Sequence, residues 1–166
     1  PNYASSGLSD AKIPDAQAGW EKAFTTGLAV MGGCNYIHHA AGMLESMGCV
    51  AYEQYVIDDE IIGQACKILE GISTDEDHLG FDAIREVGPG GNYLVSNHTF
   101  EHLRSEYFQG NGVSDKSNRE QWINNGGLSA RDRARDMVRA ILKRPLAPKI
   151  DPGIEKEIRR DFKVLL

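Results

Sequence analysis

The stretch GLSDAKIPDAQAGWEKA, from Gly7 to Ala23, decides the predicted fold. It begins with a glycine turn and small polar residues, and it continues into residues that favour a helix. Asp15 is a typical N-cap, so the sequence predicts a helix over Ala16–Met31 that stops at Gly32. Residues 1–13 are predicted to form a short strand and a loop. The pattern is that of a strand-to-helix turn with a polar loop.

Two more strands are predicted downstream of this helix. The segment CNYIHHAAGM, Cys34–Met43, contains a second strand and its following loop, and Cys49–Tyr55 forms a third. Large side chains lie on both faces of the third strand, which is typical of a strand covered on both sides in a parallel sheet. The order strand, helix, strand, strand predicts an α/β fold built from βα units.

The remainder of the chain is predicted to be mostly helical. Asp58 or Asp59 is expected to cap a helix that ends at Gly71, and Thr74 with Asp77 resembles a capping box before the next helix. Further helices are predicted over 98–108, from Ser117, from Ser129 with Asp132 as its capping box, and from Asp151 with Pro152 in its first turn. The chain is therefore divided into strand-containing residues 1–57 and a helical part, residues 58–166.

The few predicted strands have open edges. Two or three parallel strands cannot satisfy their backbone donors and acceptors alone. The chain is expected either to self-associate as a homo-oligomer or to complete a sheet supplied by another segment. Because it also starts at Pro1 in what reads as a strand, we expect a piece of a longer protein.

Composition excludes several classes of protein. The formal net charge of −6 argues against a nucleic-acid partner, which would favour a clustered basic face. No apolar run approaches the ~18 residues of a membrane span. The three cysteines form no Cys-x-x-Cys pair, which favours reduced thiols and a cytoplasmic location.

Polar residues in the first loop are the first candidate site. In a βα barrel, the working groups lie where strands end and loops begin. Asp10, Lys12 and Gln17 would lie there. The alternative is an ion pair between Asp10 and Lys12 that only holds the loop, worth about 0–1 kcal/mol if exposed.

Other candidates follow the later strands. Glu53 in a buried strand needs a partner or a raised pKa, so it is either a site residue or part of a salt bridge. Tyr36 could form an aromatic wall for a quaternary ammonium group, although strand aromatics often belong to the core. His38 and His39 should point to opposite faces of a strand, so one of them could line a pocket but both could not bind one metal.

Two histidines on a later helix have metal-binding spacing. His98 and His102 are one helical turn apart, but no third ligand is evident from the sequence, so no metal site is predicted. The segment GPGGNY follows a predicted helix and is interpreted as a turn, because it fits no nucleotide-binding pattern.

Several stretches together resemble one family. GLSDAKIPDAQAGWEKA, VAYEQYVIDDEIIG, IREVGPGGNYL and LSARDRARDMVRAIL followed by P-L-x-P resemble the C-terminal third of the trimethylamine methyltransferase family. These are corrinoid-dependent methylamine and glycine betaine methyltransferases. The resemblance implies the last strands and C-terminal helices of a (β/α)8 TIM barrel. The missing N-terminal barrel portion would then cover the open strand edges.

The resemblance also implies a reaction. It is methyl transfer from a methylated amine, such as trimethylamine or glycine betaine, to the Co(I) corrinoid (cobalamin) of a separate corrinoid protein. In one branch of the family the barrel also uses pyrrolysine, encoded by an amber codon, which would fall near the start of this chain or just before it. The sequence leaves the branch open.

The resemblance also implies roles for the residues of this chain that match the family's motifs. Asp10, Lys12, Asp15 and Gln17 match the pattern SDAK…DAQ, and Glu53 with Gln54 matches a YEQ strand end. We therefore expect catalytic roles for Asp10, Lys12 and Glu53, with Asp15 kept as a helix cap. Substrate binding is expected for these residues: Tyr36, His39, Gln17 and Gln54.

Two readings compete with this one. The first is a non-catalytic assembly module whose strands complete a sheet with another chain. The second is a metal-dependent hydrolase that uses His98, His102 and a carboxylate.

Overall fold

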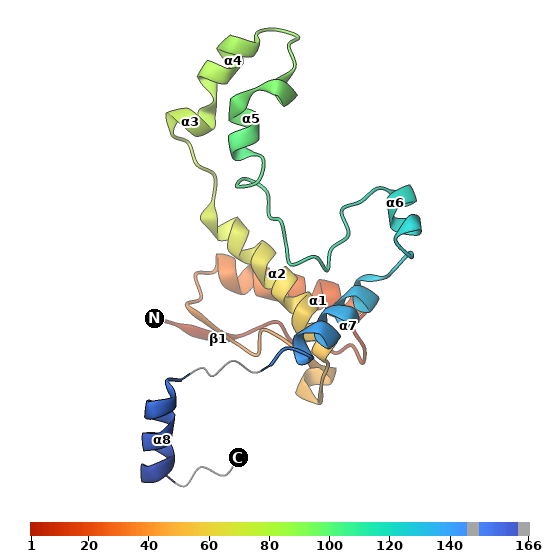
Figure 1. The fold of residues 1–166 in the computed structure, drawn as a ribbon, viewed down its shortest axis with the longest axis vertical. Coiled ribbons are helices and arrows are strands. Elements are labelled where there is room, and N and C mark those ends of the chain that lie inside the picture. The colour runs from red at the N-terminus through yellow and green to blue at the C-terminus, as the bar shows by residue number, and fades with distance from the viewer. Residues whose placement is uncertain (146–149, 163–166) are drawn as a thin grey trace.

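A computed structural model describes residues 1–145 and 150–162 of the chain. Figure 1 shows three packed helices beside a few short strands, with smaller helices standing apart from them. The strands are β1 (Tyr3–Ser5), β2 (Tyr36–His38), β3 (Met43–Leu44) and β4 (Cys49–Val50). The longer helices are α1 (Ala16–Met31), α2 (Tyr52–Glu70), α7 (Ala130–Leu142) and α8 (Pro152–Asp161). The shorter ones are α3 (Glu76–Leu79), α4 (Phe81–Val87), α5 (Asn97–His102), α6 (Arg119–Asn124), η1 (Glu45–Met47) and η2 (Tyr93–Val95).

The first strand-to-helix turn forms as predicted. α1 has the predicted bounds, and the Asp15 side chain accepts a hydrogen bond of 3.2 Å from the backbone N–H of Ala18. β1 and β2 pair in parallel, with Tyr3 opposite Tyr36. This β1–α1–β2 arrangement confirms the predicted βα unit. The described strands close no larger sheet, so the barrel itself stays a prediction.

The predicted third strand is wrong. Cys49 and Val50 form only the short strand β4, which pairs antiparallel with β3, and α2 begins at Tyr52. Asp58 and Asp59 consequently lie inside α2 and do not cap a helix. The buried positions of α2 are Gln54, Val56, Asp58, Glu60 and Ala65. Three of these five are polar, so the hydrophobic pattern of the sequence did not reveal the buried face.

For the C-terminal helices, the predicted N-terminal caps are confirmed more often than the predicted helix lengths. Ser129 and Asp132 form the predicted capping box of α7, and Asp151 caps α8 with Pro152 in its first turn. The helix predicted after the Thr74–Asp77 capping box is split at Gly80, whose left-handed φ of 64° ends α3, and its N-cap is Asp75 instead of Thr74. The helix predicted over 98–108 is the shorter α5. The P-L-x-P motif falls mostly on residues 146–149, outside the described residues.

The body of the fold is a layer of three helices. α2 packs against α1 on one side and α7 on the other (Figure 1). Small apolar clusters lie in the body, one around Ala11, Ala18 and Leu44 and one around Val56, Val113 and Ala134. The interface between α1 and α2 is polar instead, because it holds a buried lysine and aspartate that are described below.

The apolar stripe of α1 points away from this body. Trp20 and Phe24 are 63% and 69% exposed, and Leu28 and Met31 are more than half exposed. The buried positions of α1 are Ala18, Lys22, Thr26 and Val30. The strongest hydrophobic face predicted for α1 is therefore uncovered in the described chain.

The cysteines Cys34, Cys49 and Cys66 are free thiols. Among the helices described here, none combines the length and the hydrophobicity that crossing a membrane requires.

Candidate functional site

Two loops meet beside the carboxyl ends of β1 and β2. The backbone N–H of Glu45 donates to the carbonyl of Ala11 at 3.0 Å, and that of Ser46 donates to the carbonyl of Ser9 at 3.0 Å. The Ser46 hydroxyl also donates to the Asp10 carboxylate. These contacts place Asp10 in a layer made by the loop after β1 and by η1, which lies in the segment that follows β2 and β3.

Glu21 on α1 organises the first loop, and sequence reasoning missed it. One carboxylate oxygen accepts hydrogen bonds from the Ser9 hydroxyl at 2.7 Å and from the Asp10 backbone N–H at 2.9 Å. The other oxygen accepts from the Gln17 amide at 2.9 Å. The spacing of Gln17 and Glu21, four residues apart on a predicted helix, was the available sequence signal. Glu21 thus links two of the predicted site residues.

The titration of Glu21 tests this arrangement. Its three donors, the Ser9 hydroxyl first, lower the pKa of Glu21 below the ordinary value of 4.5. A depressed folded-state pKa adds stability that is present above about pH 4.5 and is lost as the pH falls through the folded pKa. We expect the Glu21 carboxyl carbon to titrate below pH 4.5 by NMR, and Ser9→Ala to move the midpoint upward. An unshifted midpoint in both proteins would contradict the hydrogen bonds.

Lys12 holds the loop in a different way from the predicted alternative. Its Nζ donates to the backbone carbonyl of Asp10 at 2.8 Å, and both residues are exposed. The described residues contain no ion pair between Lys12 and the Asp10 carboxylate. Each charged group instead has one hydrogen bond within the loop layer, the Asp10 carboxylate from Ser46 and the Lys12 ammonium to the Asp10 carbonyl.

Tyr36 begins β2, at the amino end of the paired strands, whereas His39 follows the carboxyl end of β2. The Tyr36 ring stacks on Tyr3 with centroids 5.9 Å apart, and the Tyr3 hydroxyl is 2.8 Å from Nδ1 of His38. The predicted opposite orientation of the two histidines is wrong. His39 has a left-handed φ of 62° because the chain turns after β2, so its ring lies against that of His38. Its Nδ1 is buried without a hydrogen-bond partner among the described residues.

Glu53 and Gln54 lie on α2 instead of at a strand end. The Glu53 carboxylate is 3.2 Å from Nε of Arg135 on α7, which realises the salt-bridge alternative with a downstream arginine. The pKa of Glu53 is lowered, first by its own backbone N–H in the first turn of the helix and then by Arg135. Gln54 is fully buried and donates to Asp58 at 2.7 Å, so its side chain reaches no open surface.

A buried ion pair ties both loops to the helices. Lys22 and Asp58 lie 3.0 Å apart with side chains 1% exposed. Lys22 also donates to the carbonyl of Gly7, and Asp58 accepts from the backbone N–H of Gly42 at 2.7 Å. The pair therefore fixes the loop after β1 and the loop after β2 at once. No local sequence pattern predicts this contact, because Lys22 and Asp58 are far apart along the chain.

An open hollow of about 520 Å³ adjoins the first loop. Its lining is mostly apolar and includes the exposed rings of Trp20 and Phe24 beside Asp10 and Glu21. The hollow is continuous with the uncovered stripe of α1.

Comparison with known proteins agrees with the resemblance. The family model for trimethylamine methyltransferase (MTTB) matches residues 1–164. A glycine betaine methyltransferase of Desulfitobacterium hafniense is 35% identical over 159 residues, which is 96% of this chain and 33% of that protein. A trimethylamine methyltransferase MttB of Methanosarcina thermophila is 35% identical over 159 residues, 96% of this chain and 32% of that protein.

The chain therefore spans about a third of the length of these curated relatives. The match nevertheless covers nearly every residue of the chain. The chain belongs to the trimethylamine methyltransferase family.

Proposed function

We propose that this chain is the C-terminal part of an enzyme that moves a methyl group from a methylated amine to a corrinoid protein. The substrate class is a tertiary or quaternary amine such as trimethylamine or glycine betaine, the compounds named in the relatives. The free thiols favour a cytoplasmic location.

The observation that supports this proposal is that the polar loops of this chain, a member of the family, lie at the carboxyl ends of β1 and β2. Both loops follow the carboxyl ends of strands that pair in parallel through α1. In (β/α)8 barrels this end carries the active site. We therefore propose that β1, α1 and β2 are closing units of such a barrel and that Asp10 faces its mouth.

The residues of the two loops are suited to a cationic substrate. The exposed carboxylate of Asp10 would attract a methylated ammonium group. The exposed Tyr36 ring could offer a cation–π surface, but it lies at the amino end of β2 and outside these loops. The buried, unpartnered Nδ1 of His39 and the Lys12 ammonium would orient a polar group of the amine. A Co(I) corrinoid on the partner protein would supply the nucleophile. The chain itself then needs to hold the amine and direct one methyl group outward.

Glu53 and Gln54 take supporting parts in this proposal. Their contacts with Arg135 and Asp58 hold α2 against α7 and the buried ion pair. Gln17 acts through Glu21, which positions the loop that carries Asp10.

The uncovered apolar stripe of α1 supports the proposal that a further part of the barrel packs against this helix. Trp20, Phe24, Leu28 and Met31 form an apolar surface next to the open hollow. We propose that the N-terminal portion present in the relatives packs on this surface. Burying it would be favourable at about 25 cal/mol per Å² of apolar area.

The experiment uses the chain alone and a chimaera. In the chimaera, the matching 159 residues of the Desulfitobacterium hafniense glycine betaine methyltransferase are replaced by this chain. We expect little or no methyl transfer to cob(I)alamin by the 166-residue chain, because it spans only about a third of the length of its curated relatives. The chimaera should transfer methyl groups from trimethylamine or glycine betaine. Activity of the chain alone, or a folded chimaera inactive with every methylated amine, would contradict the proposal.

The competing assembly module gives a different result. Open strand edges and the α1 stripe would also suit pairing with a second copy of the chain. Sedimentation that shows a stable homo-oligomer of the chain, together with an inactive chimaera, would favour that module. The genomic sequence upstream decides the pyrrolysine branch, since an in-frame amber codon marks it.

A further inference from the structure

Three histidines converge on the short helices that stand apart from the body in Figure 1. The ring of His102 on α5 lies 4.3 Å from that of His98 and 4.9 Å from that of His78, measured between centroids. Three carboxylates surround these rings. We call this group the histidine cluster, and its members are His78, His98, His102, Asp75, Asp77 and Glu106.

The cluster lies in a part of the chain that has no apolar core of its own. Within residues 71–112, all of which the structure describes, Ser96 is the single buried residue. Large apolar side chains such as Leu94, Val95 and Phe100 are 64–73% exposed. Small units that cannot bury enough apolar surface are commonly held together by a structural metal ion.

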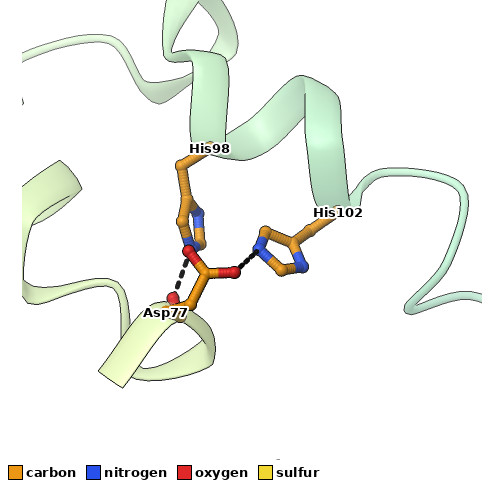
Figure 2. Close-up of side chains that lie close together, drawn as sticks. All are labelled: Asp77, His98 and His102. Carbon is orange, nitrogen blue, oxygen red and sulfur yellow. Dashed lines mark hydrogen bonds and ion pairs between the residues drawn. The ribbon is translucent and has the colours of Figure 1, made fainter. Parts of the chain in front are cut away.

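Three members of the cluster form a ligand set. One carboxylate oxygen of Asp77 and one ring nitrogen each of His98 and His102 lie within 4.8 Å of one another. Figure 2 shows the two rings reaching down from α5 toward Asp77 on α3, and Nε2 of His102 is 3.2 Å from the Asp77 carboxylate. Ligands at 2.0–2.1 Å from a zinc ion lie roughly 3.3 Å from one another, so small side-chain rotations would close the site.

Each of the two histidines has an oxygen partner at one ring nitrogen, which leaves the other ring nitrogen to bind a cation. Nε2 of His98 lies 2.7 Å from the Asp77 backbone carbonyl, which only accepts hydrogen bonds, so Nε2 carries the proton and Nδ1 keeps a free lone pair. Nδ1 of His102 faces the Glu106 carboxylate at 3.7 Å, which leaves Nε2 on the side of Asp77. Such outer carbonyl and carboxylate partners fix the tautomers of metal-binding histidines.

The turn between α3 and α4 leaves room for the His98 ring. Gly80 adopts a left-handed φ of 64°, and a Cβ there would lie 3.3 Å from Cε1 of His98. Glycine thus lets the His98 ring pack directly over the end of α3. His78 is held by Asp75 at 2.7 Å and lies outside the three-ligand set.

We propose that Asp77, His98 and His102 bind one zinc ion, which joins α3 to α5 and orders this part of the chain. Two imidazoles and one carboxylate match the nitrogen and oxygen ligands that zinc prefers. The site is separate from the loops that carry Asp10, so it holds whether or not the methyl-transfer proposal does.

The test is zinc titration of the tag-free 166-residue chain after treatment with a chelator. Calorimetry should show one zinc ion per chain, and thermal unfolding should shift upward when zinc is added. Glu106→Gln should weaken zinc binding by about 10–100-fold, and His102→Ala should weaken it further. Matched controls are Asp77→Ala against Asp82→Ala, and His98→Ala against His38→Ala. Asp82 has a side chain 95% exposed on α4, and His38 lies on β2.

The controls should bind zinc like the parent chain, with equal helix content by circular dichroism. Lack of zinc binding by the parent chain would overturn the proposal. Zinc binding that survives in Asp77→Ala, His98→Ala and His102→Ala would overturn it as well, because the ion would then lie elsewhere.

Discussion

Replacing Asp58 with alanine is expected to destabilise the folded chain by about 3–5 kcal/mol, because the buried ammonium of Lys22 would lose its counter-charge. The two groups are 3.0 Å apart and almost fully buried. Asp58 also accepts hydrogen bonds from Gln54 and from the backbone of Gly42. Urea unfolding followed by circular dichroism measures the change in the free energy of unfolding.

A double-mutant cycle separates the pair from its surroundings. Lys22→Met alone should be destabilising by a similar amount, whereas Lys22→Met with Asp58→Leu should cost less than the sum of the two single changes. Asp136→Ala is the control, because this exposed aspartate only pairs with Arg139 on α7 and should cost no more than about 0.5 kcal/mol. Additive single changes would show that the ion pair does not form.

The pKa of Asp58 explains why the double variant is milder. Burial raises the pKa of Asp58 above its ordinary 3.8, against the lowering effects of Gln54, Lys22 and Gly42. Ionising Asp58 therefore costs the folded state free energy. This penalty is absent below pH 3.8 and reduces stability as the pH rises through the folded pKa, although the ionised Asp58 still neutralises the charge of Lys22. An apolar pair of similar volume avoids this cost.

Glu21→Ala is expected to lower kcat/KM for methyl transfer by the chimaera about 100-fold, because it frees the loop that carries Asp10. A displacement of about 1 Å at a site can cost this much in rate. The carboxylate of Glu21 binds the Ser9 hydroxyl and the Asp10 backbone at 2.7 and 2.9 Å. Steady-state kinetics with glycine betaine or trimethylamine measures the loss.

A conservative variant distinguishes positioning from general loss of structure. Glu21→Gln keeps an oxygen acceptor for the loop and should retain most of the activity. Glu155→Ala is the matched control, since this residue only pairs with Arg159 on α8 at 2.8 Å. Equal activity of Glu21→Ala and Glu155→Ala would contradict a positioning role for Glu21.

The sequence predicted those elements whose signals are local. The Asp15 cap and the glycines after Met31 define α1, and the capping box of Ser129 and Asp132 marks the start of α7. These signals act within a few residues, so no tertiary information is needed.

The errors have a common physical cause, which is the burial of polar side chains. Gln54 and Asp58 on α2 face Lys22 on α1, so the buried face of α2 has the composition of an exposed one. Because this buried face has no apolar helical pattern, the large side chains within Cys49–Tyr55 were interpreted as a strand. Contacts between segments that are distant along the chain also could not be predicted from the sequence. An example is the contact between Asp77 and His102, which are 25 residues apart.

The central claim is that the loops after β1 and β2 form the amine site, and the activity of Asp10→Asn in the chimaera tests it most directly. The change removes one negative charge and keeps the shape of the side chain. We expect kcat/KM for the cationic substrate to fall by about tenfold or more, whereas Asp136→Asn on α7 should leave it unchanged. Asp10→Asn with the same kcat/KM as Asp136→Asn would contradict the account.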